Sequence, residues 1–245
     1  MKHKVLDLFS GIGGFSLGLE NTGKFDTVAF CEIESYPRKV LSKHWPNVKL
    51  HLDVTKLKGE EVGTVNLITG GFPCQDLSSA GEARGIGEST RSGLFQHMLR
   101  LAEECGRPFI LFENVNRLLS GPTESKGEWF NNFLWPLAKI GYDAEWFCLS
   151  ASSVGAAHLR ERLWVVAYPN ETQLKRGGIS LRVHKEHSNF SNSCWGKDKP
   201  GLVRTSNGVP SQMDRLGCLG NAVVPKIPEI IGLALDEALT YKEYK

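Results

Sequence analysis

Short apolar runs recur along the first two thirds of the chain, each bounded by glycine, proline or polar residues. Runs of this length are typical of buried strands. The predicted strands are Val5–Phe9, Thr27–Cys31, Val65–Thr69, Phe109–Phe112, Ala144–Leu149 and Leu163–Ala167. The predicted helices between them are Phe15–Glu20, Ser35–Trp45, Gly93–Cys105 and Trp129–Ile140. This alternation predicts an α/β fold with a mainly parallel, twisted sheet and helices on both faces.

The pattern changes after Pro169. Residues 170–204 are rich in Ser, Asn and Gly and show no clear periodicity, so they predict a small irregular insert. Globular character returns at Val209, and apolar residues at helical spacing predict a C-terminal helix. These residues are Ile227, Ile230, Ile231, Ala234, Leu235 and Ala238. We therefore expect a main domain formed by residues 1–169 with 209–245, and an insert at 170–208.

Bulk composition is that of an ordinary globular protein: 245 residues, 41% hydrophobic and 23% charged. The chain has no apolar run of membrane-spanning length, and Met1–Lys4 lead straight into a strand without a signal-peptide pattern. Six scattered cysteines without a Cys-x-x-Cys pair predict a reducing, cytoplasmic setting. His184, His187 and Cys194 lack a fourth ligand and the zinc spacing, so no metal site is expected.

Charge is distributed unevenly. The whole chain carries only +2, whereas residues 170–204 hold seven basic and three acidic side chains, a net charge of +4. The basic residues are Lys175, Arg176, Arg182, Lys185, Lys197, Lys199 and Arg204. A basic insert on a near-neutral body suits contact with a polyanion. The alternative is a solvated loop without a binding role.

A glycine-rich turn, Ser10–Gly14, separates the first predicted strand from the first helix. Strand, glycine turn and helix together allow close approach of backbone amides to a ligand. The third glycine of the dinucleotide fingerprint is missing, so a nucleotide-like cofactor and a plain tight turn both remain open. Glu32 follows the second strand about 20 residues later, where such folds place an acid on a ribose. Asp53 is a second such acid, and either residue could equally be a solvated loop carboxylate.

Cys74 follows the predicted strand Val65–Thr69 through Gly70-Gly71-Phe72-Pro73. The carboxyl ends of strands in open α/β sheets are where ligands bind, so this thiol is either a nucleophile or a small buried apolar residue. The glycine-rich stretch Gln75–Arg91 is too long for a simple connector and suggests a binding loop or a lid. A second polar group, Glu113-Asn114-Val115, follows the strand Phe109–Phe112.

Several of these stretches, in this order, resemble the cytosine-C5 DNA methyltransferases. The matching pieces are Asp7–Phe15, Glu32, Asp53, Gly71–Gln75, Glu113–Val115, Arg160–Arg162 and Gly220–Pro225. The resemblance covers residues 4–168 and 209–240 and implies a Rossmann-like, S-adenosylmethionine-dependent methyltransferase fold. It also implies methyl transfer to C5 of a cytosine that is flipped out of duplex DNA.

The resemblance implies a role for each site residue. Cys74 adds as a thiolate to C6 of cytosine, and a protonated Glu113 assists at N3. Arg160 and Arg162 lie beside the base, where their forked donors suit its O2 and a nearby phosphate. The implied cofactor contacts are Phe9, Gly11, Gly13, Glu32, Ile33, Asp53, Leu94 and Asn221. The implied DNA contacts are Gln75, Ser78 and Arg91, to which the basic insert adds Lys175, Arg176, Arg182 and Lys185.

Two departures from the family pattern concern the site. His158 stands where the family usually has glutamine two residues before the first arginine. Only about 40 residues, between Pro169 and Val209, occupy the place of the family's separate target-recognition domain. We therefore interpret 170–208 as a reduced target-recognition insert. A helper subunit or a cognate restriction enzyme remains open as a partner, and a monomer that meets the bacterial nucleoid through DNA is expected.

Three other functions are weighed against this one. A tRNA cytosine-C5 methyltransferase would carry a Cys-Phe-Thr signature, which this sequence lacks. A catalytically silent DNA-binding or cofactor-binding relative is disfavoured, because all the residues for the chemistry are present. A nicotinamide dehydrogenase is disfavoured by the incomplete glycine fingerprint.

Overall fold

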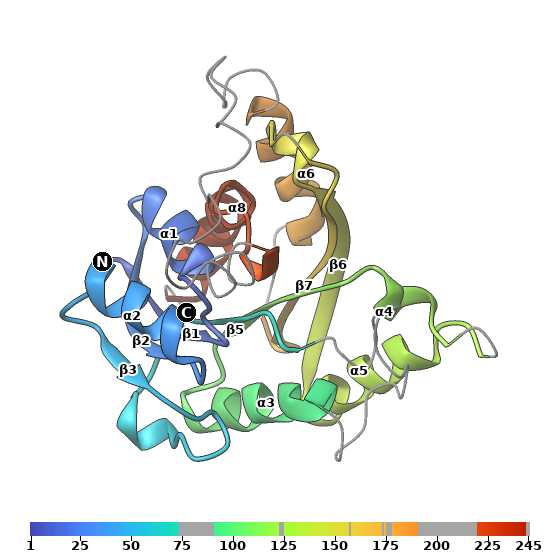
Figure 1. Cartoon of the computed structure of the whole chain (residues 1–245). Helices are drawn as coiled ribbons and strands as arrows, with labels where there is room; N and C mark the ends of the chain where they lie inside the picture. The colour runs from blue at the N-terminus through green and yellow to red at the C-terminus, as the bar shows by residue number, and fades with distance from the viewer. Residues whose placement is uncertain are drawn as a thin grey trace, which may run out of the picture.

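In a computed structural model, the described residues are 1–73, 91–122, 125–156, 158–172, 174, 178–190 and 220–243. Within them, seven strands form one sheet in the order β3-β2-β1-β4-β5-β7-β6 (Figure 1). The strands are β1 (His3–Leu8), β2 (Phe25–Cys31), β3 (Lys49–His51), β4 (Leu67–Gly70), β5 (Phe109–Asn114), β6 (Tyr142–Ser150) and β7 (Glu161–Pro169). The predicted α/β class is confirmed.

Strand direction decides which residues meet at one edge. Strands β1 to β5 pair in parallel, whereas β7 pairs antiparallel with both β5 and β6. The carboxyl ends of β1, β2, β4 and β5 therefore share an edge with the first residues of β7, and Glu113 of β5 is paired with Trp164. Strand β7 begins two residues before the predicted strand, so Arg162 lies within the sheet.

Helices cover both faces of the sheet (Figure 1). The longer helices are α1 (Gly14–Asn21), α2 (Ser35–His44), α3 (Phe95–Glu104), α5 (Glu128–Lys139), α6 (Gly178–Phe190) and α8 (Lys226–Glu243). Short helical turns are η1 (Gly59–Glu61), η2 (Arg91–Leu94), α4 (Arg117–Ser120) and η3 (Ser152–Val154). One apolar core joins α3 and α5 to the sheet, and a second joins α1, α6 and α8 to it. The sheet is thus buried on both sides, as parallel sheets require.

Helix α6 corrects the expectation of an irregular insert. Residues 178–190 are helical, and Ile179 and Val183 are fully buried in the core that contains Trp164. The Glu145 carboxylate of β6 accepts hydrogen bonds from the backbone amides of Ile179 at 3.1 Å and Ser180 at 2.8 Å. A carboxylate at this position satisfies amides that have no partner within the helix. The first part of the predicted insert therefore packs on the main domain.

No helix among the described residues is long and apolar enough to cross a membrane.

Candidate active site

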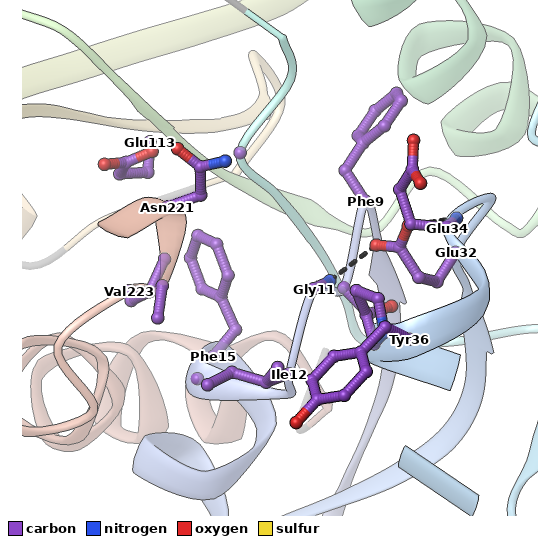
Figure 2. A pocket seen from close by; sticks show the side chains of 15 residues that line it. Phe9, Gly11, Ile12, Phe15, Glu32, Glu34, Tyr36, Glu113, Asn221 and Val223 are labelled. Atoms are coloured by element: carbon purple, nitrogen blue, oxygen red, sulfur yellow. Dashed lines mark hydrogen bonds between the residues drawn. The ribbon is translucent and has the colours of Figure 1, made fainter. Parts of the chain in front are cut away.

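A cavity of about 400 Å³ opens at the shared edge of the sheet (Figure 2). The residues around it come from the glycine turn, the segments after β2 and β4, the end of β5, the start of α2 and the segment before α8. The lining residues are Phe9, Ser10, Gly11, Ile12, Gly14, Phe15, Glu32, Glu34, Tyr36, Pro37, Gly71, Glu113, Asn221, Ala222 and Val223. The predicted site residues Phe9, Gly11, Glu32, Glu113 and Asn221 are thus brought together from four separate parts of the sequence.

The glycine turn adopts backbone conformations that few residues tolerate. Gly11 and Gly13 have φ of 54° and 86°, and Phe9 has φ of 52°. A Cβ on Gly13 would lie 2.6 Å from the Trp45 ring, and a Cβ on Gly14 would lie 2.6 Å from the Val223 carbonyl oxygen. Glycine is therefore required both for the left-handed turn and for the close approach of the segment before α8.

Glu32 is held in place from two sides. Its Oε2 accepts a hydrogen bond from the Gly11 amide at 2.7 Å, and its Oε1 accepts one from the Glu34 amide at 2.7 Å (Figure 2). The residue is 7% exposed. Each carboxylate oxygen has a second lone pair, so Glu32 can still accept hydrogen bonds from a ligand hydroxyl pair. The arrangement orients an acceptor beside the glycine turn before any ligand binds.

Glu113 lies on the opposite side of the cavity from Glu32 (Figure 2). Its Oε1 is 2.9 Å from Nε of Arg162 and 3.9 Å from Nη2 of Arg160. Burial raises the pKa of this carboxyl above its ordinary value, whereas the positive charges of Arg162 and Arg160 oppose the rise. A carboxyl under these opposing influences suits proton exchange with a bound base.

Arg160 also links this carboxyl to the C-terminal part of the chain. Its guanidinium donates to the backbone carbonyl of Gly220 and, at 3.3 Å, to that of Asn221. Asn221 lines the same cavity as Glu113 (Figure 2). A segment distant in sequence is thereby fixed next to the proposed catalytic residues.

The β4 strand leads into the site through two close contacts. A Cβ on Gly70 would lie 2.7 Å from Cε of Met98, and one on Gly71 would lie 3.0 Å from Oε2 of Glu113. The next residue, Phe72, is buried, and its carbonyl accepts a hydrogen bond from the Asn114 amide group at 3.2 Å. The backbone that precedes Cys74 is therefore fixed against the Glu113-Asn114 strand end.

Other predicted residues lie elsewhere. Gly13, Ile33, Asp53 and Leu94 are not among the described residues that line the cavity. Ile33 is 67% exposed, and the Asp53 carboxylate accepts hydrogen bonds from the Thr55 amide and hydroxyl, which lower the pKa of Asp53. Cofactor contacts for these four residues stay predictions.

The predicted DNA contacts are described only in part. Cys74, Gln75, Ser78, Lys175, Arg176 and the side chain of Arg91 lie outside the described residues. Lys185 is exposed on α6. The Arg182 side chain is only 14% exposed and pairs with Glu237 of α8 at 3.6 Å, an arrangement that favours a structural role.

Sequence reasoning missed part of the cavity wall. Tyr36 and Pro37 occupy the first turn of α2, and Val223 precedes α8. Tyr36 and Pro37 follow Glu32 within five residues, and this proximity to a predicted ligand-binding acid was the available signal. Val223 belongs to a stretch that was matched to the family but was given no contact.

Residues 3–201 match the family described as C-5 cytosine-specific DNA methylase. The chain belongs to this family. It is 36% identical over 222 residues to a type II methyltransferase, M2.BsuMI, of Bacillus subtilis, covering 84% of this chain and 55% of that protein. It is 35% identical over 183 residues to a type II methyltransferase, M.Sau3AI, of Staphylococcus aureus, covering 69% of this chain and 44% of that protein.

A solved structure shares the fold. It is a putative DNA modification methyltransferase encoded within an Escherichia coli prophage, with a TM-score of 0.57 and 26% identity, covering 71% of this chain and 49% of that one. The chain spans about half the length of the two curated relatives described above.

Proposed function

We propose that this protein is a DNA (cytosine-5-)-methyltransferase that uses S-adenosylmethionine as methyl donor. The observation that carries the proposal is the cavity itself. One side presents a glycine turn and an oriented carboxylate, Glu32, and the other presents a buried carboxyl, Glu113, between two arginines. A nucleoside-like cofactor on the first side would meet a base on the second.

The described residues fit the cofactor. The cavity volume of about 400 Å³ lies within the range of about 300–1,000 Å³ that is usual for small-ligand sites. Glu32 supplies an acceptor for a ribose hydroxyl pair, Phe9 and Tyr36 supply aromatic surface, and Asn221 supplies a polar group near Glu113. When bound, S-adenosylmethionine provides a methyl group on a positively charged sulfur.

The chain's own residues would carry the remaining chemistry. The Cys74 thiolate attacks C6 of the flipped cytosine, which moves electron density toward C5 and N3. Protonated Glu113 supports this charge at N3, and Arg160 and Arg162 provide donors beside it. After methylation, loss of the C5 proton and departure of the thiolate restore the aromatic ring.

Substitution of the proposed nucleophile tests the function. The purified protein is incubated with duplex DNA and radiolabelled S-adenosylmethionine, and the modified positions are located by bisulfite sequencing. We expect Cys74→Ser to abolish methyl transfer while S-adenosylhomocysteine still binds, because a hydroxyl is a far weaker nucleophile than a thiolate. The wild-type protein should form a covalent adduct with 5-fluorocytosine DNA. Turnover by the serine variant, absence of the adduct, or methylation of tRNA in place of DNA would contradict the proposal.

For target recognition we propose the reduced insert at 170–208, with α6 as its base. His187 near the end of α6 contacts the Ser153 carbonyl at 3.1 Å, and Gly220 contacts Arg160. The chain therefore leaves α6 beside η3, just after the end of β6, and returns beside the arginine pair. This placement supports a role near the bound base. A helper subunit and a cognate restriction enzyme remain proposals of the same kind.

A further inference from the structure

Asp7 is a buried carboxyl that the proposed chemistry does not use. It is the second-last residue of β1 and has no exposed surface. It does not line the cavity, but it lies three residues before Ser10, where the glycine turn begins. A carboxyl this deeply buried normally requires a cation or a full set of hydrogen-bond partners.

Two hydroxyl groups and the Ser16 backbone amide are its hydrogen-bond partners. Oδ2 lies 2.7 Å from Oγ of Ser16 on α1, and Oδ1 lies 2.9 Å from Oγ1 of Thr69 on β4. The Asp7 carbonyl also accepts a hydrogen bond from the Ser10 hydroxyl at 2.6 Å. Asp7 therefore joins the start of α1, the glycine turn and the strand that leads to Gly70-Gly71.

The charge around this carboxyl favours its neutral form. Within the described part of the chain, the charged group that acts on Asp7 is Glu32 of the segment after β2, whose negative charge disfavours a second carboxylate. Helix α1 presents the hydroxyl and the backbone amide of Ser16, and β4 presents the hydroxyl of Thr69. Burial raises the pKa of Asp7 to about 7, and the two hydroxyls together with the Ser16 backbone amide oppose the rise. A hydroxyl can donate or accept, so both contacts also satisfy a protonated carboxyl.

We propose that Asp7 is a positioning residue that acts in its protonated form, holding the glycine turn and the β4 strand end in the geometry that binds the cofactor. The inference rests on the proposed function, because the cofactor site is the one argued above. Ionisation would place a second negative charge in the core near Glu32, and the repulsion between the two carboxylates would disturb the turn whose Gly11 amide orients the Glu32 carboxylate.

The pH dependence of cofactor affinity tests this role. Titration calorimetry with S-adenosylhomocysteine is performed between pH 6 and pH 8. Only the protonated fraction binds, so a midpoint near 7 predicts about tenfold weaker apparent affinity at pH 8 than at pH 6. Asp7→Asn, which is isosteric and permanently neutral, should bind at pH 6 like the wild type and show no such loss. Glu113→Gln should keep the pH dependence, because that carboxyl is not its source.

The hydroxyl partners provide a second variant pair. Ser16→Ala and Thr69→Val each remove a hydrogen-bond donor that favours the ionised form of Asp7. Each substitution should therefore move the midpoint of the pH dependence of cofactor affinity to higher pH. If these two hydroxyls have only a structural role, their removal would change the melting temperature without moving the midpoint of the pH dependence. If Asp7→Asn does not fold, the Ser16→Ala and Thr69→Val variants test the proposal in its place. An unchanged midpoint in both variants would then overturn the proposal.

Two other results would also overturn it. One is a folded Asp7→Asn protein that loses affinity at pH 6, and the other is a wild-type affinity that does not vary with pH. Absence of wild-type binding at every pH would instead refute the proposed cofactor site.

Discussion

Single residues in and next to the cavity are oriented mainly by backbone groups. Glu32 is bound by two amides, Asn114 binds the Phe72 carbonyl, and Arg160 binds two carbonyls of the segment before α8. Side chains held in this way lose little freedom when a ligand arrives, so their interaction with it is less opposed by entropy. The site is therefore largely formed by the fold itself.

Glu32→Ala should weaken cofactor binding by roughly 1–3 kcal/mol, the cost of leaving polar partners without an acceptor. The variant also frees the Gly11 and Glu34 amides, so Glu32→Gln serves as the matched control that retains one acceptor oxygen. Calorimetric titration with S-adenosylhomocysteine measures both. Equal affinity of the alanine variant and the wild type would show that the carboxylate does not contact the cofactor.

How far the site could be predicted differs from residue to residue. The glycine turn and Glu32 are identifiable because strand, turn and acid follow one another at a spacing set by the fold. The contact of Glu113 with Arg160 and Arg162 cannot be identified from the sequence, because it depends on β7 running antiparallel beside β5. The sequence places Asp7 only within the stretch Asp7–Phe15. Its burial and its contacts with Ser16 and Thr69 depend on the packing of α1 and β4 around β1.

Individual elements follow the apolar pattern where that pattern is strong. The helices α3 and α5 and the strands β1, β2 and β5 lie within a few residues of their predicted bounds. Helix α6 is not predicted from the sequence, because Ile179 and Val183 are the only fully buried residues among 178–188. In the sequence, Ile179, Leu181 and Val183 alternate with polar residues, and this spacing is not a helical period. Contacts with β6 and α8 stabilise this helix more than its own sequence does.

The Glu145 carboxylate should therefore contribute measurably to α6. We expect Glu145→Ala to lower the free energy of unfolding by about 1–2 kcal/mol, the usual range for removing a helix cap. Loss of protection against amide hydrogen exchange should be greatest in the first turn of α6. Asp143→Ala, an exposed acid on the same strand, is the matched control. Equal exchange in the two variants would mean that packing of Ile179 and Val183 alone holds the helix.

At the scale of the whole molecule, the two sides of the cavity that we propose to bind the cofactor and the base meet at one edge of the sheet. The chain nevertheless spans about half the length of its curated relatives, and its proposed recognition insert is short. Each good bidentate contact to a base discriminates by only about 1–3 kcal/mol. We therefore expect the chain alone to specify about two to four base pairs. Methylome sequencing of cells that express it checks this, and six or more specified bases would contradict it.

The placement of α6 also divides the basic residues of the insert into two groups. Arg182 pairs with Glu237 and is mostly buried, whereas Lys185 is exposed on the same helix. Phosphate contacts need side chains that can displace counterions, so Arg182 is a poor source of them. We expect the attraction to DNA to come from Lys185 together with Lys175 and Arg176.

The triple variant Lys175→Gln, Arg176→Gln and Lys185→Gln should weaken binding to all duplex sequences alike. The slope of log affinity against log salt is negative, and each lost phosphate contact reduces its magnitude by about 0.9. The magnitude of the slope should therefore fall by roughly 2–3 in the triple variant. Arg182→Gln is the matched control, and it should lower thermal stability while leaving the slope unchanged. Filter binding at several salt concentrations measures the slopes.

Cofactor affinity should be the same in all variants, because Glu32 and Asn221 lie outside the insert. An unchanged slope in the triple variant would show that this part of the insert is a solvated surface, and a reduced slope in Arg182→Gln would show that its ion pair with Glu237 opens on DNA.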